Sequence, residues 1–380
     1  MPTSTSPGGQ DARAILALSE SSAQGSTIGV ITRRGYTIAT FGRDRVGLSS
    51  GDGNIAAPRR AETPLTQIGF VGLGRMGGNM VARIKRDSEH DVVAYDRDAA
   101  TVKQVAGDTG ARGARSLSDL VKKLDTPRMV WIMVPAGAPT QATVDKLAGL
   151  LEKGDMVIDG GNSKWTDDRD RAAVLKQAGI DYLDVGTSGG VWGLEVGYCM
   201  MVGGPGPAVK RLSPILDVLA PETNEASRSV LGDRGWGHFG PSGAGHYVKM
   251  VHNGVEYGLM QAYAEGFDLF DKCDFDLDNA KIAHLWNQGS VVRSWLCELA
   301  ALAFEQEGNT LPGLSGYTAD SGEGRWTIED AMAKDVPTPV ITASLHARFY
   351  SRGNGDFTHR MLAALRAQFG GHATQKSADG

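Results

Sequence analysis

Five polar residues recur at helical spacing in the second half of the chain. Lys249, His252, Asn253, Glu256 and Tyr257 stand at i, i+3, i+4, i+7 and i+8, so a helix places all five on one face. A solvated face would account for any one of them, but a stripe with one Lys and one Glu after a glycine-rich segment favours a site. A neutral lysine can take a hydroxyl proton if its pKa is lowered, and a carboxyl group can return a proton. The stripe therefore suits oxidation of an alcohol followed by protonation of a carbanion or enol.

A second motif lies near residue 70, where an apolar run passes into glycines. The sequence reads GxGxxG after an expected strand and at the start of an expected helix, the context in which this motif binds a dinucleotide. The helix N-terminus would supply N–H donors to the phosphates. Asp96 ends the next expected strand, 19 residues after Gly77, where a carboxylate accepts ribose hydroxyls and repels a 2′-phosphate. We predict NAD as the cofactor, with NADP as the alternative, bound by the motif residues Gly72, Leu73, Gly74, Arg75, Met76 and Gly77 together with Asp96.

The elements that position these motifs change in kind along the chain. Strand-like runs such as "QIGFV", "HDVVAYD", "MVWIMV", "MVIDGG" and "DYLDVG" alternate with helical stretches, a pattern typical of a parallel, doubly wound sheet. After about residue 243 the strand signals stop and long amphipathic helices follow. The predicted fold class is α/β, a Rossmann domain followed by an all-helical domain. The predicted domains are residues 65–242, which bind the dinucleotide, and residues 243–380, which bind substrate, mediate dimerisation and end in a tail.

Residues 1–64 differ from the rest of the chain. They are rich in Ser, Thr, Gly and Arg and poor in large apolar residues. We interpret them as a disordered extension or a misassigned start. A transit peptide is the weaker alternative, because such segments are usually poor in acidic residues.

Composition excludes several classes of function. With 39 basic and 44 acidic residues the net charge is −5, which gives no basic stripe and argues against nucleic acid as a partner. No apolar run has the length of about 20 residues that a membrane span requires, so no membrane association is expected. The 3 cysteines are widely spaced, which suits a reducing cytoplasm and offers no structural zinc pattern. We expect a cytoplasmic protein without a bound metal.

The run "GAGHYVKMVHNGVEYG" resembles the signature helix of the decarboxylating 6-phosphogluconate dehydrogenase family. "GLGRMGGN", "DGGNS", "GTSGG" and "GEGRWT" occur in the family's order, and the likeness covers residues 66–372, closest to its shorter, NAD-preferring branch. The resemblance implies an enzyme of the pentose phosphate pathway and gluconate utilisation. It would oxidise 6-phosphogluconate at C3 and release CO2, with Lys249 as general base and Glu256 as general acid.

The resemblance also implies roles for further residues. Val134, Pro135 and Ala136 of "MVPAG" match the loop beside the nicotinamide, and Asn162 of "DGGNS" matches a residue near both cofactor and substrate. The other implied substrate-binding residues are Ser188, Gly189, Gly190, His252, Asn253, Tyr257, Arg348, Arg366 and His372.

The C-terminal residues carry an expectation about assembly. Arg366 and His372 keep the spacing of two family residues that reach the neighbouring subunit's site, so the resemblance implies a homo-oligomer, a dimer or a tetramer. One departure concerns the phosphate pocket, where Ser321 and Glu323 stand in place of Lys and Thr in many members.

Two other functions remain open from the sequence. A non-decarboxylating 3-hydroxy acid dehydrogenase, of the 3-hydroxyisobutyrate or tartronate semialdehyde type, shares the glycine motif and the Lys249–Asn253 pair. A non-catalytic dinucleotide sensor would have no chemical need for both Lys249 and Glu256. The decarboxylating enzyme is favoured over the first alternative by His252, Glu256, Tyr257, Arg348, Arg366 and His372, and over the second by the presence of both Lys249 and Glu256.

Overall fold

The computed structural model describes residues 65–221 and 235–353, positions 357, 358 and 361, and two strands nearer the N-terminus. The chain divides into two compact units, Met1–Glu62 and Thr63–Gly380. In the first unit β1 (Ile28–Arg33) pairs antiparallel with β2 (Tyr36–Phe41). The rest of the predicted extension 1–64, and the tail residues Arg366 and His372, lie outside the described residues.

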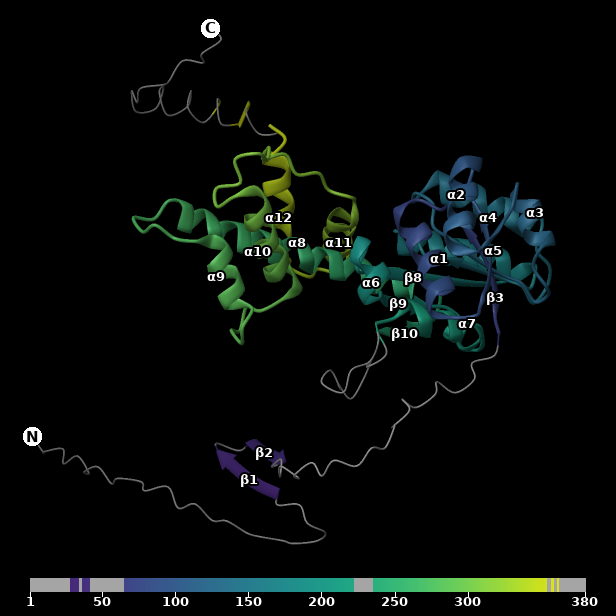
Figure 1. Cartoon of the computed structure of the whole chain (residues 1–380), viewed down its shortest axis with the longest axis horizontal. Coiled ribbons are helices and arrows are strands. Elements are labelled where there is room, and N and C mark those ends of the chain that lie inside the picture. The colour runs from purple at the N-terminus through teal and green to yellow at the C-terminus, as the bar shows by residue number, and fades with distance from the viewer. Residues whose placement is uncertain are drawn as a thin grey trace, which may run out of the picture. The chain divides into compact units, whose positions relative to one another are not determined.

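The second unit contains an eight-stranded sheet in the order β10-β9-β8-β7-β6-β3-β4-β5. Figure 1 shows β8, β9 and β10 next to one another in this sheet. Six strands run parallel, and they are β3 (Gln67–Val71), β4 (Asp91–Tyr95), β5 (Arg112–Gly113), β6 (Met129–Ile132), β7 (Met156–Asp159) and β8 (Asp181–Ser188). At one edge β9 (Cys199–Gly203) pairs antiparallel with β8, and β10 (Trp236–Gly240) pairs parallel with β9. The predicted doubly wound Rossmann architecture is confirmed. The sheet is parallel except between β8 and β9, where the chain turns back after β8.

Helices and side chains cover both faces of the sheet. The apolar residues of β3 alternate between the two faces, so Phe70 belongs to one buried cluster and Val71 to the other. Phe70 stacks on Trp131, with ring centroids 5.6 Å apart. The covering helices are α1 (Arg75–Asp87), α2 (Ala99–Thr109), α3 (Leu117–Lys122), α4 (Ala138–Ala148), α5 (Trp165–Gln177), α6 (Gly193–Val196) and α7 (Gly206–Leu219), with the 3₁₀ turn η1 (Gly190–Trp192) before α6.

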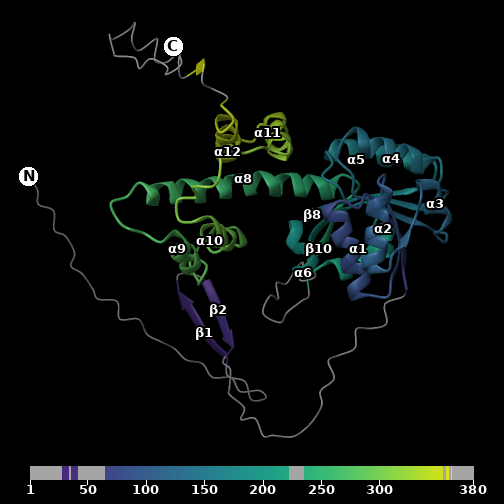
Figure 2. The same ribbon diagram turned by 45° about the horizontal axis from the view of Figure 1, so that its top comes forward.

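The long helix α8 (Ala244–Asp271) leads from the sheet into the helical region, as Figure 2 shows. The remaining helices are α9 (Asn279–Trp286), α10 (Trp295–Glu307), α11 (Glu323–Ala333) and α12 (Pro339–Tyr350). Figure 2 places α11 and α12 on one side of α8 and α9 and α10 on the other. A small core around Phe267 and Phe304 holds α8, α9 and α10 together. Among the described helices, none has the length and apolar character needed to cross a membrane.

Candidate active site

The N-terminal turns of α8 lie directly against the sheet. A Cβ on Gly245 would lie 2.4 Å from the Met201 carbonyl oxygen, and one on Gly186 would lie 2.3 Å from the Cβ of Lys249. These contacts allow only glycine at both positions. The close approach fixes Lys249 beside the end of β8, at the carboxyl edge of the parallel strands where open α/β sheets bind ligands.

Lys249 is buried, with 8% of its surface exposed. Burial lowers the pKa of its ammonium group, while the carboxylates of Glu256 and Glu323 and the nearby Cys199 partly oppose the shift. Desolvation therefore favours the neutral amine. A neutral amine facing a cavity is the form that a proton-accepting lysine requires.

A cavity of about 1160 Å³ lies between α8 and the glycine loop. Of the predicted site residues, its walls contain Gly74, Arg75, Met76, Gly77, Val134, Pro135, Asn162, Ser188, Gly189, Gly190, Lys249, His252, Asn253 and Glu256. One cavity thus brings together the turns that follow β3, β6 and β7, the first residues of α1, the end of β8 and one face of α8. A second cavity, of about 1290 Å³ and lined by residues such as Trp165 and Phe239, contains none of the predicted residues.

The glycine loop has the geometry that a dinucleotide needs. Gly72 has a φ of +93°, and a Cβ on Gly77 would lie 2.0 Å from the Gly72 carbonyl oxygen, so the turn and the start of α1 require glycine. A Cβ on Gly74 would meet nothing within 4 Å, which leaves open space at the helix N-terminus. Gly74 caps α1 without a side-chain hydrogen bond, so the first N–H groups of the helix remain available to phosphate oxygens.

Asp96 holds the glycine loop through a hydrogen bond from the backbone. Its Oδ2 accepts the Leu73 N–H at 2.8 Å, and its Oδ1 accepts the Asp98 N–H at 2.9 Å. The carboxylate is half-buried at the end of β4, and its remaining lone pairs can accept further donors. The loop, the open space and Asp96 together fit a dinucleotide.

On α8 the polar stripe forms one wall of the cavity. Nδ1 of His252 lies 3.8 Å from Glu256 Oε2 and 3.0 Å from Asn253 Oδ1, and its Nε2 lies 3.5 Å from Ser188 Oγ. His252 and Glu256 are both about one-third exposed in their side chains, at 35% and 37%. This wall can therefore exchange protons with a bound molecule.

Tyr257, the last residue of the stripe, lies beside the cavity. Gly324 of α11 packs against its ring, and the Arg348 guanidinium lies over the ring, 3.5 Å from the ring centroid. The Tyr257 hydroxyl accepts the Ser321 N–H at 3.2 Å. The Ser321 hydroxyl donates to Glu323 Oε2 at 2.6 Å, and Glu323 Oε1 is buried without a hydrogen-bond partner among the described residues.

Not every predicted site residue lines the cavity. Gly72, Leu73, Asp96 and Ala136 are not among its lining residues, and Tyr257 and Arg348 form a neighbouring cluster with Ser321. The cavity is also lined by residues that the sequence did not predict, among them Met133, Gly160, Trp295 and Leu299. His246 was not predicted either. The feature that could have singled it out is its place in the motif "GAGHYVKMVHNGVEYG", three residues before Lys249.

Comparison with known proteins identifies the family. The "NAD binding domain of 6-phosphogluconate dehydrogenase" matches residues 67–227, and the "6-phosphogluconate dehydrogenase, C-terminal domain" matches residues 245–378. A relative from Haloferax volcanii, named NAD(+)-dependent, decarboxylating 6-phosphogluconate dehydrogenase, is 45% identical over 82% of this chain and 100% of its own length. The chain belongs to the 6-phosphogluconate dehydrogenase family. The predicted family is therefore confirmed.

Solved structures agree with this assignment. The Plasmodium falciparum 6-phosphogluconate dehydrogenase, studied with NADP+ and with 6-phosphogluconate, has a TM-score of 0.67 at 27% identity and covers 83% of this chain and 67% of its own. The Mycobacterium tuberculosis 3-hydroxyisobutyrate dehydrogenase has a TM-score of 0.59 at 24% identity, with coverage of 77% and 94%. The second likeness concerns the fold alone.

Proposed function

We propose that this protein oxidises 6-phosphogluconate at C3 with NAD and releases the C1 carboxylate as CO2, giving ribulose 5-phosphate. The observation that supports this most directly is the buried Lys249, which lines the same cavity as the glycine loop. Membership of the family and the NAD-dependent relative support this reaction.

In the first step Lys249 acts as the general base. Its buried amine takes the proton of the C3 hydroxyl as that carbon is oxidised to a ketone. A bound nicotinamide supplies the hydride acceptor. Residues 72–77 and Asp96 would hold the dinucleotide, with Val134, Pro135, Ala136 and Asn162 beside its nicotinamide end.

In the second step the C1–C2 bond breaks and C1 leaves as CO2. The electron pair forms a C2–C3 double bond, and the C3 oxygen takes back the proton held by Lys249, which gives an enediol. Glu256 then protonates the carbon that becomes C1 of the product. Its neighbour His252, 3.8 Å away, can share the proton, and both side chains face the same cavity as Lys249. Ser188, Gly189, Gly190 and Asn253 would bind the sugar acid along this wall.

At the far end of the substrate, Arg348 would bind the phosphate. A guanidinium fork matches phosphate oxygens, and the Tyr257 ring holds this one in place. We further propose that the protein is a homo-oligomer, in which Arg366 and His372 reach the site of a neighbouring subunit. In this proposal residues 65–242 bind the dinucleotide and residues 243–380 bind substrate and the partner.

We also propose that the protein is cytoplasmic, because its cysteines are free thiols. Cys199, Cys273 and Cys297 are free cysteines, which fits the reducing cytoplasm.

The test is a comparison of substrates and cofactors on one preparation. Purified protein is mixed with 6-phosphogluconate or 3-hydroxyisobutyrate, each with NAD and with NADP, and reduced nicotinamide is followed by absorbance. We expect the highest kcat/KM for 6-phosphogluconate with NAD. A higher value for 3-hydroxyisobutyrate would refute the substrate, and a higher value for NADP would refute the role given to Asp96.

A further inference from the structure

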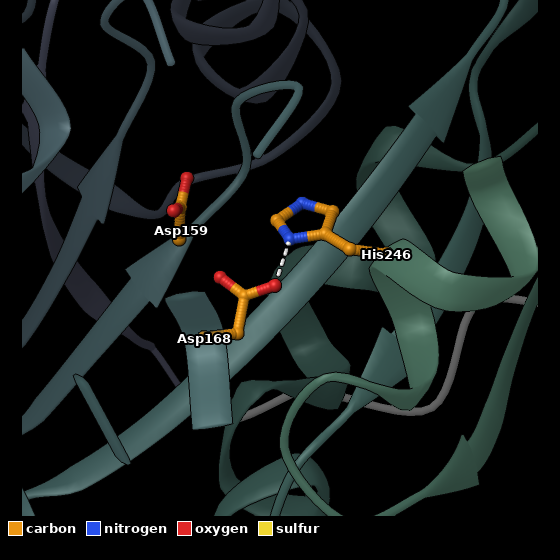
Figure 3. A group of neighbouring side chains, drawn as sticks. All are labelled: Asp159, Asp168 and His246. Atoms are coloured by element: carbon orange, nitrogen blue, oxygen red, sulfur yellow. Dashed lines mark hydrogen bonds and ion pairs between the residues drawn. The ribbon is translucent and has the colours of Figure 1, made fainter. Parts of the chain in front are cut away.

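Behind the cavity wall lies a cluster of buried charges from three elements. Asp159 ends β7, Asp168 lies on α5 and His246 lies on the first turn of α8, and all are at most 1% exposed (Figure 3). His246 Nδ1 lies 2.7 Å from Asp168 Oδ2, and its Nε2 lies 3.1 Å from the Gly161 carbonyl oxygen. The imidazole therefore joins α5 and the turn after β7 to the helix that carries Lys249.

The ligand atoms of these three residues lie within 4.8 Å of one another, close enough to hold a metal ion. Two observations favour an ion-pair network instead. Arg171 Nη1 lies 3.2 Å from Asp159 Oδ2 and 3.6 Å from Asp168 Oδ1, so a guanidinium already neutralises the carboxylates. Both nitrogens of His246 face acceptor oxygens, so both must carry hydrogen, and an imidazolium has no lone pair for a metal.

The same network holds the turn at residues 160–162 from two sides. Asp159 Oδ1 accepts the Gly161 N–H at 3.0 Å, and His246 donates to the Gly161 carbonyl. Asn162 follows immediately, on the cavity wall. Lys249 lies one helical turn beyond His246, so a single side chain links the two walls.

We propose that His246 is a positioning residue, a buried imidazolium that fixes the turn at residues 160–162 relative to Lys249. This inference rests on the proposed function, in which Asn162 and Lys249 contact the reactants. Without the link, α8 would still pack on β8, but the turn at residues 160–162 would lose its direct contact with the helix that carries Lys249. A misplacement of about 1 Å costs on the order of 10²-fold in rate.

The charge of His246 follows from the groups around it. Burial disfavours the cation, but the carboxylates of Asp168, Asp159 and Asp184 raise the pKa of His246 to about 10. Burial raises the pKa of Asp184, whose oxygens accept the N–H groups of Gly243 and His246. The imidazolium should therefore persist through neutral pH.

Two further charged or titratable groups belong to the network, Arg171 on α5 and Tyr182 on β8. The Tyr182 hydroxyl lies 2.9 Å from Asp168 Oδ1 and 3.1 Å from Asp159 Oδ2, and its single hydrogen is donated to these carboxylates. Burial raises the pKa of this phenol well above its ordinary value. Tyr182 thus stays neutral. It reaches the 160–162 turn only indirectly, through Asp159, so Tyr182→Phe removes one hydrogen bond of the network and leaves the link from His246 to Gly161 in place.

The experiment compares His246→Gln with Tyr182→Phe in the full chain. A glutamine amide cannot hold both Asp168 and Gly161 in the imidazole geometry, so we expect kcat to fall about 10- to 100-fold. We expect Tyr182→Phe to keep kcat within about threefold while losing comparable thermal stability, and NAD affinity to stay unchanged in both variants. Equal kcat values in the two variants, with only their Tm lowered, would overturn the proposal.

A second measurement separates this inference from the proposed function. Hydrogen exchange without substrate should be faster at residues 160–163 in His246→Gln than in Tyr182→Phe. Unchanged exchange there would overturn the positioning role, whereas a wild-type protein without turnover would refute only the reaction. If His246→Gln does not fold, Asp168→Asn replaces it. Removing that carboxylate lowers the pKa of His246. On the alkaline side of the pH–kcat profile, activity should therefore be lost at a lower pH than in wild type. An alkaline side that stays at the wild-type pH would contradict the proposal.

Discussion

Gly186→Ala is expected to impair catalysis without removing any functional group. The added methyl would lie 2.3 Å from Lys249 Cβ and 3.0 Å from the Gly245 carbonyl oxygen, whereas an ordinary contact is 3.4–4 Å. Helix α8 would therefore have to retreat by about 1 Å from β8. A shift of that size at the general base predicts a loss of about 10²-fold in kcat, together with about 1–3 kcal/mol of stability from overpacking.

The assay is reduced-nicotinamide absorbance with saturating 6-phosphogluconate, accompanied by thermal unfolding. Gly107→Ala on α2 is the control, because a Cβ there would meet nothing within 4 Å. That variant should keep wild-type kcat and a Tm equal to or above wild type. Folded Gly186→Ala with wild-type kcat would refute the argument that close packing of α8 on β8 places Lys249.

Three other variants test the roles of individual side chains. Lys249→Met should lower kcat by about 10²- to 10⁴-fold with NAD affinity unchanged, and near-normal turnover would remove Lys249 from the mechanism. Glu323→Gln removes a carboxylate that raises the pKa of Lys249, so the acid side of the pH profile of kcat/KM should move to lower pH. The control is Glu329→Gln, which lies on the same helix but pairs with Lys164 and should not shift this profile. Arg348→Ala should raise the KM for 6-phosphogluconate about 10-fold or more with little change in kcat, and an unchanged KM would place the phosphate elsewhere.

Local patterns predicted much of the architecture. The five parallel strands expected from apolar runs are present, because buried strands read as continuous apolar segments. The helical spacing on α8 likewise brought four of five stripe residues to one cavity. Tyr257 departs from this because α11, which the sequence does not place relative to α8, packs on its ring through Gly324.

What the sequence could not predict depends on contacts between distant segments. The antiparallel edge arises where the chain returns from β8 to β9, and β10, read as "WGHFG", carries two glycines and little apolar pattern. His246 and Asp168 are 78 residues apart, so their pairing exists only once α5 and α8 meet. The sequence therefore offered His246 only as a motif residue near Lys249 and could not show its pairing with Asp168.

The most direct test of the proposed reaction follows the carbon that leaves. Protein, NAD and 6-phosphogluconate labelled at C1 are mixed, and labelled CO2 and reduced NAD are measured together. The account predicts one CO2 for each NAD reduced, with ribulose 5-phosphate as the product. Reduced NAD without labelled CO2 would contradict it and would indicate a dehydrogenase that stops at the keto acid.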